Sequence, residues 1–154
     1  MRELHLANGL LIRGDLILLV ASRYPNLEHP LWHLPGGRRR AGELLHATLR
    51  REFAEETGLT VQSEHLLYLS ESFDHATTTH ILSATFSVQA QGESRCPLDD
   101  AHIVDLAWVP REELAGTITV NVVREPLLAY LNGSRRAYFG FENADVSIVF
   151  ADET

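Results

Sequence analysis

Residues 37–59 read GRRRAGELLHATLRREFAEETGL, and this stretch decides the fold. Leu45, Leu49 and Phe53 recur every four residues, which is the spacing of one helix face. Gly58 stands where the C-terminal cap of such a helix belongs. We therefore predict a helix over residues 43–57 that follows a glycine-containing loop.

Three glutamates lie on one face of this predicted helix. Glu52, Glu55 and Glu56 have the spacing i, i+3 and i+4, which makes them neighbours on a helix surface. Like charges at this spacing destabilise a helix by roughly 0.2–0.5 kcal/mol per pair, and Arg51 alone does not neutralise three acids. Carboxylate oxygens suit Mg²⁺ or Mn²⁺, so the cluster predicts a divalent cation. For an isolated cluster, the alternative is a solvated charged face.

The same stretch resembles the Nudix signature G-x5-E-x7-R-E-U-x-E-E-x-G-U, in which U is a bulky hydrophobic residue. The resemblance extends to residues 32–37 and 106–110, so that most of residues 10–115 fits the family layout. Phe53 departs mildly, because that position usually holds an aliphatic residue. The fixed positions are filled by Gly37, Glu43, Arg51, Glu52, Glu55, Glu56 and Gly58, with Phe53 and Leu59 at the hydrophobic ones.

The resemblance implies an α/β fold, the Nudix-type α/β/α sandwich with a mixed β-sheet and a loop-helix-loop catalytic motif over residues 37–59. It implies a pyrophosphohydrolase that cleaves a nucleoside diphosphate linked to another group, by attack of water at phosphorus. Glu52, Glu55 and Glu56 would hold the metal together with the carbonyl oxygen of Gly37 or a neighbour. Glu52, Glu55 and Arg51 are the catalytic candidates, and Glu43 is the expected ionic partner of Arg51.

The general base stays open between two kinds of residue, since relatives use either a glutamate of the motif or an acid from a later loop. Glu52 is the first choice. His102 stands where relatives often have a glutamate, and its reference pKa of about 6.5 suits a base. A lone histidine is more often a surface residue. The remaining candidates are Glu93, Asp99, Asp100 and Asp105.

Arginines near the motif are candidates for binding the substrate. Arg38, Arg39 and Arg40 adjoin the predicted metal site, where guanidinium groups could hold phosphate oxygens, or they could form a solvated loop. Arg23 follows an apolar segment, from whose end an arginine reaches the site in relatives. Three further side chains could stack on a base, or could belong to the core or to turns: Tyr24, Phe73 and His75.

Outside the motif, the pattern predicts strands interleaved with helices. We expect an opening hairpin from residues 3–13 and 16–23, strands over 66–73, 79–88 and 103–109, and a short strand over 31–34. A helical turn at 110–114 and a helix over about 120–131 follow. The apolar runs at 137–141 and 146–151 predict a C-terminal hairpin over 137–151, which could pair between subunits of a homodimer.

Composition favours one domain over residues 1–154 in a soluble, cytoplasmic protein. The chain has 45% hydrophobic residues, a single cysteine and no apolar segment of membrane-spanning length. A net charge of −8 argues against a general nucleic-acid binder but allows a small anionic ligand, which the resemblance implies is a nucleotide.

The substrate itself is not predicted. Residues 73–77 lack both the proline typical of relatives that act on ADP-ribose and the tyrosine typical of those that act on dinucleoside polyphosphates. A nucleoside triphosphate, a nucleotide sugar or a dinucleotide therefore remains an alternative substrate. The competing function is a Nudix-like module that senses a nucleotide metabolite without cleaving it, although the intact acidic set argues against this.

Overall fold

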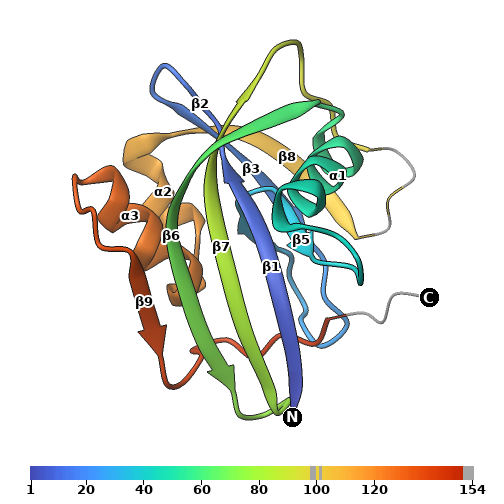
Figure 1. Ribbon diagram of the computed structural model, residues 1–154, viewed down its shortest axis with the longest axis vertical. Helices are drawn as coiled ribbons and strands as arrows, with labels where there is room; N and C mark the ends of the chain where they lie inside the picture. Colours follow the sequence, from blue (N-terminus) through green and yellow to red (C-terminus); the bar gives the residue numbers. More distant parts are fainter. Residues whose placement is uncertain (98–99, 101, 151–154) are drawn as a thin grey trace.

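The computed structural model describes residues 1–97, 100 and 102–150, and two β-sheets form its framework (Figure 1). In the larger sheet the strand order is β5-β1-β7-β6-β9. The pairs β1–β7 and β6–β9 are parallel, whereas β1–β5 and β6–β7 are antiparallel. The predicted α/β class with a mixed sheet is confirmed. Its strands are β1 (Arg2–Leu10), β5 (Gly36–Arg38), β6 (Val61–Asp74), β7 (Thr79–Ala90) and β9 (Tyr138–Phe141).

A second, antiparallel sheet was not predicted. Its central strand β3 (Leu16–Ser22) pairs with β2 (Ile12–Arg13), β4 (Leu31–His33) and β8 (Ile103–Pro110). Positions 17–21 of β3 are almost completely buried, so both faces of this strand are covered. This explains why β3 is a continuous apolar run rather than an alternating one.

The helix α1 (Leu45–Thr57) lies against β1, β5 and β6 of the larger sheet. It ends as predicted at Gly58, whose φ of 73° is left-handed and whose N–H donates to the carbonyl of Ala54 at 3.1 Å. It begins two residues later than predicted, because the Glu43 carboxylate accepts hydrogen bonds from the backbone N–H of Arg40 and the hydroxyl of Thr48. Glu43 thus belongs to the loop before the helix.

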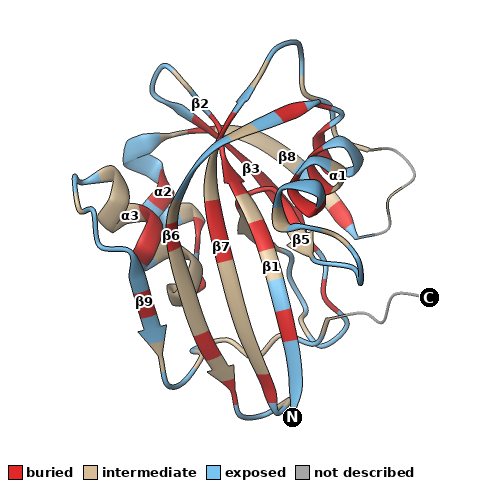
Figure 2. Ribbon diagram, in the orientation of Figure 1, coloured by how far each residue is buried: buried red, intermediate tan, exposed pale blue. Residues whose placement is uncertain are grey.

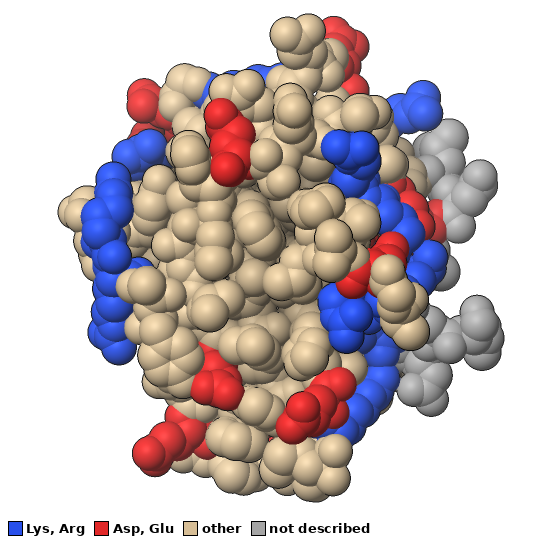
Figure 3. Space-filling view, viewed as in Figure 1, with Lys and Arg blue, Asp and Glu red and all other residues tan. Residues whose placement is uncertain are grey.

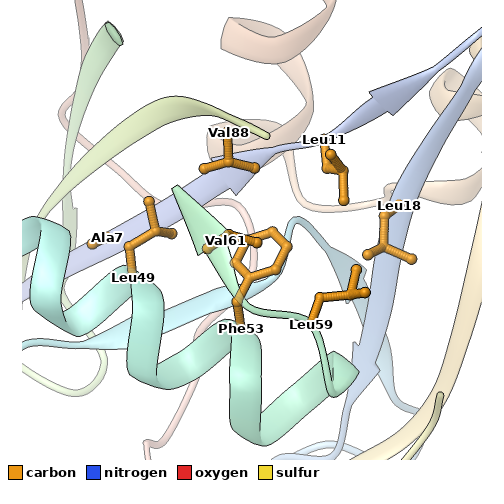
Figure 4. Packing of buried hydrophobic residues seen from close by; sticks show 8 residues of the cluster. All are labelled: Ala7, Leu11, Leu18, Leu49, Phe53, Leu59, Val61 and Val88. Atoms are coloured by element: carbon orange, nitrogen blue, oxygen red, sulfur yellow. The ribbon is translucent and has the colours of Figure 1, made fainter. Parts of the chain in front are cut away.

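The inner face of α1 packs on the sheet through Leu49 and Phe53, both completely buried (Figure 4). Figure 2 shows buried positions on α1 and along β1, β3 and β7, where this core lies. At Gly9 of β1 an added Cβ atom would lie 2.5 Å from the Phe53 ring. The aromatic residue at position 53 therefore fits because glycine stands opposite it. The cluster comprises Ala7, Leu11, Leu18, Leu49, Phe53, Leu59, Val61 and Val88.

The other helical elements close a second core against β3 and β8. They are the 3₁₀ turn η1 (Arg111–Glu113), α2 (Leu114–Thr117) and α3 (Asn121–Leu131). Leu114, Ile118 and Leu127 are completely buried there. Pro126 lies inside α3. None of the helices in the described ranges is long and apolar enough to cross a membrane.

The predicted opening hairpin is largely wrong. Only Ile12 and Arg13 pair back onto β3, whereas residues 2–10 pair in parallel with β7. The glycine at position 14 does make the tight turn, with φ of 61°. Hydrophobic alternation indicates a strand but does not identify the strand with which it pairs. After β1 the chain passes from the larger sheet to the second sheet, just before the turn.

The predicted hairpin over residues 137–151 is also wrong within the described part of the chain. Tyr138–Phe141 forms β9 and pairs in parallel with β6, and residues 142–150 form no strand. Side chains from elsewhere in the fold bind the backbone of residues 147–149. This tail is held within its own chain, and pairing between subunits stays a prediction.

The charged residues surround one broad face of the larger sheet. Figure 3 shows uncharged side chains across the centre of this face, with basic and acidic groups around its edge. Proteins that bind a phosphate backbone instead present clustered basic side chains to it. The centre of this face, as drawn, carries no such basic cluster.

Candidate active site

Two glycines bring the backbone of β5 against the acidic face of α1. A Cβ atom on Gly36 would lie 2.1 Å from the carbonyl oxygen of Ala7, and one on Gly37 would lie 2.6 Å from the carboxyl carbon of Glu52. Gly36 donates its backbone N–H to Oε1 of Glu56 at 2.9 Å. Glycine is therefore required at position 36 for β5 to lie this close to β1, and at position 37 for β5 to lie this close to Glu52.

Glu52, Glu55 and Glu56 line one cavity of about 350 Å³. Glu52 and Glu56 are 9% and 3% exposed, whereas the side chain of Glu55 is 48% exposed. Burial raises the pKa of Glu56 well above its ordinary value of 4.5, and the neighbouring charge of Glu52 raises it further. Ionisation of Glu56 beside Glu52 is therefore unfavourable unless a positive charge binds there.

Arg51 joins α1 to the loop that precedes it. Its Nε and Nη2 atoms bind the two carboxylate oxygens of Glu43 at 2.8 and 2.9 Å, a bidentate pair. Its Nη1 atom donates to Oε1 of Glu52 at 2.7 Å, and Nη2 also donates to the carbonyl of Arg38 at 3.0 Å. Glu55 lies farther off, at 3.6 Å from Nη1. Arg51 thus orients Glu52 while it fixes the loop.

Replacement of Glu43 by glutamine should reduce the acid sensitivity of the fold. The Arg51 guanidinium lowers the pKa of Glu43 from 4.5 to about 2. A lowered pKa means that the ionised form stabilises the folded state above the unfolded-state pKa and that this contribution is lost as the pH falls towards 2. Urea unfolding at several pH values between about 2 and 5 should show that the free energy of unfolding changes less with pH in Glu43→Gln than in the wild type.

Glu112→Gln, an exposed position on η1, is the control and should keep the pH dependence of the wild type. The same pH dependence in Glu43→Gln and the wild type would show that the ion pair contributes nothing to stability in this pH range.

The donor set fits a hard divalent cation. Carboxylate and carbonyl oxygens are the ligands of Mg²⁺ and Mn²⁺, and a bound cation would offset the burial and the like charges that raise the pKa of Glu56. Among the described residues, no three acidic, histidine or cysteine side chains are grouped closely enough in this conformation to hold an ion. Glu52 is turned towards Arg51 and Glu56 towards the N–H of Gly36. Rotation of these side chains is needed for joint coordination.

Of the arginines considered for substrate binding, only Arg38 lines the cavity. The Arg39 guanidinium turns back to the carbonyl of Glu43 at 3.3 Å, and Arg40 and Arg23 are exposed outside the cavity lining. Proximity to the motif suggested Arg38, Arg39 and Arg40, but only Arg38, the last residue of β5, lines the cavity.

Among the candidate bases, the cavity lining includes Glu52, His102 and Asp100. Nδ1 of His102 lies 2.8 Å from the carbonyl oxygen of Arg23. Because a carbonyl oxygen only accepts hydrogen bonds, Nδ1 carries the proton, and Nε2 is the acceptor nitrogen of the neutral ring. Asp100 accepts the N–H of His102, and its charge also raises the pKa of Glu56. Glu93 and Asp105 do not line the cavity, and Asp99 lies outside the described residues.

The cavity floor was missed by sequence reasoning. It is formed by polar side chains at alternate positions of β1, β6 and β7, and Asn8 donates to Ser83 at 2.5 Å within it. The alternation of hydroxyl residues was the available signal, because successive side chains of a strand point to opposite faces. Of the three rings considered for stacking, only Tyr24 lines the cavity. The polar floor residues are Asn8, Tyr68, Ser70, Ser72, Ser83 and Thr85.

His33 is a neutral part of the cavity wall. Its Nδ1–H donates to the carbonyl of Leu34 at 2.7 Å, and Nε2 accepts from the hydroxyl of Ser22 at 2.5 Å. Burial lowers the pKa of His33 to about 4. The wall therefore gains no positive charge from this ring near neutral pH.

A family model described as NUDIX domain matches residues 3–131. The chain belongs to the NUDIX hydrolase family. Phosphatase NudJ of Escherichia coli K12 is 30% identical over 109 residues, which cover 68% of this chain and 69% of that protein. The NUDIX signature seen in the sequence coincides with β5, the following loop and α1, the elements that build the acidic wall of the cavity.

Two solved structures of NUDIX proteins have a similar fold. A NUDIX hydrolase from Nitrosomonas europaea is 24% identical with a TM-score of 0.75, over 88% of this chain and 93% of that one. A MutT NUDIX hydrolase from Burkholderia pseudomallei is 25% identical with a TM-score of 0.71, over 82% and 97%. The chain is thus a NUDIX pyrophosphohydrolase, from a class of enzymes that generally uses divalent metal ions.

Proposed function

We propose that this enzyme hydrolyses the pyrophosphate bond of a nucleoside diphosphate derivative, with Mg²⁺ or Mn²⁺ held by Glu52, Glu55, Glu56 and the carbonyl of Gly37. The substrate would be a nucleoside triphosphate, a nucleotide sugar or a dinucleotide. The observation that supports this proposal most directly is the group of three glutamates in one cavity wall. It includes the buried Glu56, whose pKa is raised by burial and by like charges. A bound divalent ion would withdraw charge from phosphate oxygens and make water more acidic.

The protein side chains position the reactants in this proposal. Arg51 holds Glu52 through its Nη1 atom, and Glu43 holds Arg51 in turn. Arg38 enters the cavity beside the glutamates, where a guanidinium can bind phosphate oxygens in pairs. Glu52 remains the preferred base, because it is in the cavity wall and is held in place. His102, with a basic Nε2 atom, is the alternative.

We also propose that residues 1–154 act as one NUDIX domain in the cytoplasm. The family match covers most of the chain, and β9 extends the same sheet beyond the matched residues. The single cysteine, Cys96, is compatible with a reducing compartment.

A product assay over a panel of substrates tests the proposed function. The panel contains nucleoside triphosphates, nucleotide sugars, ADP-ribose and dinucleoside polyphosphates, each with Mg²⁺, with Mn²⁺ and with excess chelator. We expect a phosphate-bearing product from at least one substrate, and none with the chelator. Release of no product from any substrate, with nucleotide binding retained, would instead identify a sensing module. Equal rates with and without chelator would refute the metal requirement.

A further inference from the structure

The segment that follows β9, residues 142–150, is a strap across one end of the cavity. In Figure 1 it runs from β9 past the ends of β6, β7 and β1 towards the loop between β3 and β4. The family match ends at residue 131, so the strap lies outside the part of the chain that the family accounts for. Two of its side chains, Ile148 and Phe150, nevertheless line the same cavity as the glutamates.

Two side chains from distant parts of the chain hold the strap in place. Asp74, at the end of β6 and 4% exposed, accepts the Ser147 hydroxyl and the backbone N–H of Ile148, each at 3.0 Å. Asn26, in the loop after β3, donates to the carbonyl of Ser147 at 2.8 Å and accepts the N–H of Val149 at 2.9 Å. Residues 147–149 are therefore tied to both sheets.

Tyr24 connects the strap to the acidic wall. Its ring meets Phe150 edge to face, with centroids 5.8 Å apart, and it is 8% exposed. Tyr24, Phe150 and the three glutamates line the same cavity. A group bound there beside the glutamates can therefore pack against the two rings.

Beyond the acidic wall, the cavity offers little charge to a substrate. The lining residues described by the structure include one arginine, Arg38, and four acids, Glu52, Glu55, Glu56 and Asp100. The strands supply hydroxyl and amide groups, and the walls supply apolar and aromatic side chains such as Trp32 and Val123. The volume of about 350 Å³ is near the lower end of the roughly 300–1,000 Å³ usual for ligand pockets.

We propose that Ile148 and Phe150 of the strap determine the substrate class, by closing the cavity around one uncharged, ring-bearing group attached to the diphosphate. This inference rests on the proposed hydrolase function. A second nucleoside would not fit in the cavity of about 350 Å³ beside the first. The selected class is thus a mononucleoside di- or triphosphate, and dinucleotides are disfavoured.

Substitutions within the strap test this proposal. The substrates are ATP and diadenosine tetraphosphate, which share the same base and differ in the second nucleoside. We expect the wild type to have the larger kcat/KM for ATP. Phe150→Ala should lower the ratio of kcat/KM for ATP to that for the dinucleotide by roughly tenfold, and Ile148→Ala by a smaller factor. Phe150→Leu should keep much of the wild-type ratio. The matched control is Val149→Ala, because Val149 is on the strap, is exposed and does not line the cavity.

A binding measurement separates this inference from the proposed function. Calorimetry with AMP requires no turnover and should show roughly tenfold weaker binding to Phe150→Ala than to Val149→Ala or the wild type. Thermal unfolding of each variant verifies that it folds. Unchanged AMP binding and an unchanged substrate ratio in Phe150→Ala would overturn the role of the strap, even in an active hydrolase. If the wild type hydrolyses nothing but still binds AMP more tightly than Phe150→Ala does, only the proposed hydrolase function is overturned.

Discussion

Glu56→Gln is expected to lower the hydrolysis rate by at least about 100-fold. Even groups that only support metal ligands typically change affinity or activity by roughly 10- to 100-fold, and Glu56 is proposed as a direct ligand. The amide keeps the size of the side chain and can still accept the N–H of Gly36. Steady-state assays at saturating Mg²⁺ with the best substrate of the panel would measure the loss. Full activity of the variant would remove Glu56 from the metal site.

The same variant should be more stable than the wild type in the absence of metal. Because the pKa of Glu56 is raised in the folded protein, the folded state retains a proton that the unfolded state loses above its pKa of 4.5. Stability is therefore lost as the pH rises above this value, and glutamine removes that loss. At about pH 8 with chelator, Glu56→Gln should melt at a higher temperature.

Added Mg²⁺ should reverse this order, because an ion that binds the folded state raises the melting temperature of the wild type more than that of the variant. Glu64→Gln, an exposed position on β6, serves as the control and should behave as the wild type in both buffers. A variant that is less stable than the wild type without metal would contradict the charge imbalance inferred for the site.

Phe53→Ala should reduce the free energy of unfolding by about 3–5 kcal/mol, the usual loss for a buried aromatic residue. Phe53 is completely buried between α1 and the sheet, and in α1 it directly follows Glu52 and precedes Glu55 and Glu56 by two and three residues. Small domains are stable by roughly 5–15 kcal/mol in total, so the variant should lose a large share of its stability. Urea unfolding followed by circular dichroism measures this difference.

Substitution of Gly9, which stands opposite the Phe53 ring, tests the same packing contact. Gly9→Ala should destabilise the wild-type background by about 1–3 kcal/mol, because its Cβ atom would lie 2.5 Å from the Phe53 ring. In a Phe53→Leu background the same change should be milder, with a coupling energy of about 1 kcal/mol between the two positions. Additive effects would show that the ring and the glycine do not constrain each other.

The acidic helix was predictable because its information is local. The spacing of Leu45, Leu49 and Phe53 marks the buried face, and the signature fixes the glutamates on an adjoining face. The end of α1 at Gly58 was confirmed for the same reason, whereas the mixed sheet was expected from the family resemblance. Local periodicity carries no information on pairing, so the second sheet and the parallel position of β1 could not be inferred from it.

The rest of the candidate site depends on contacts between residues far apart in sequence. Asp74 lies 73 and 74 positions from its partners Ser147 and Ile148, and Asn26 lies 121 positions from Ser147. An aspartate after a strand has the composition of an ordinary turn residue, and it does bind the N–H groups of residues 76 and 77 in that way. Its second role, as the anchor of the strap, could not be predicted, because no local sequence pattern indicates it.

The way in which the strap is held bears on how such an enzyme could change during evolution. Asp74 and Asn26 bind mainly backbone atoms of residues 147–149, and these atoms are the same whatever side chains stand there. Mutations at positions 148 and 150 can therefore reshape the cavity while the anchoring persists. The glutamates of α1 need not change at the same time. New substrate preferences could arise through drift in a few C-terminal codons, in a lineage that keeps its hydrolytic chemistry throughout.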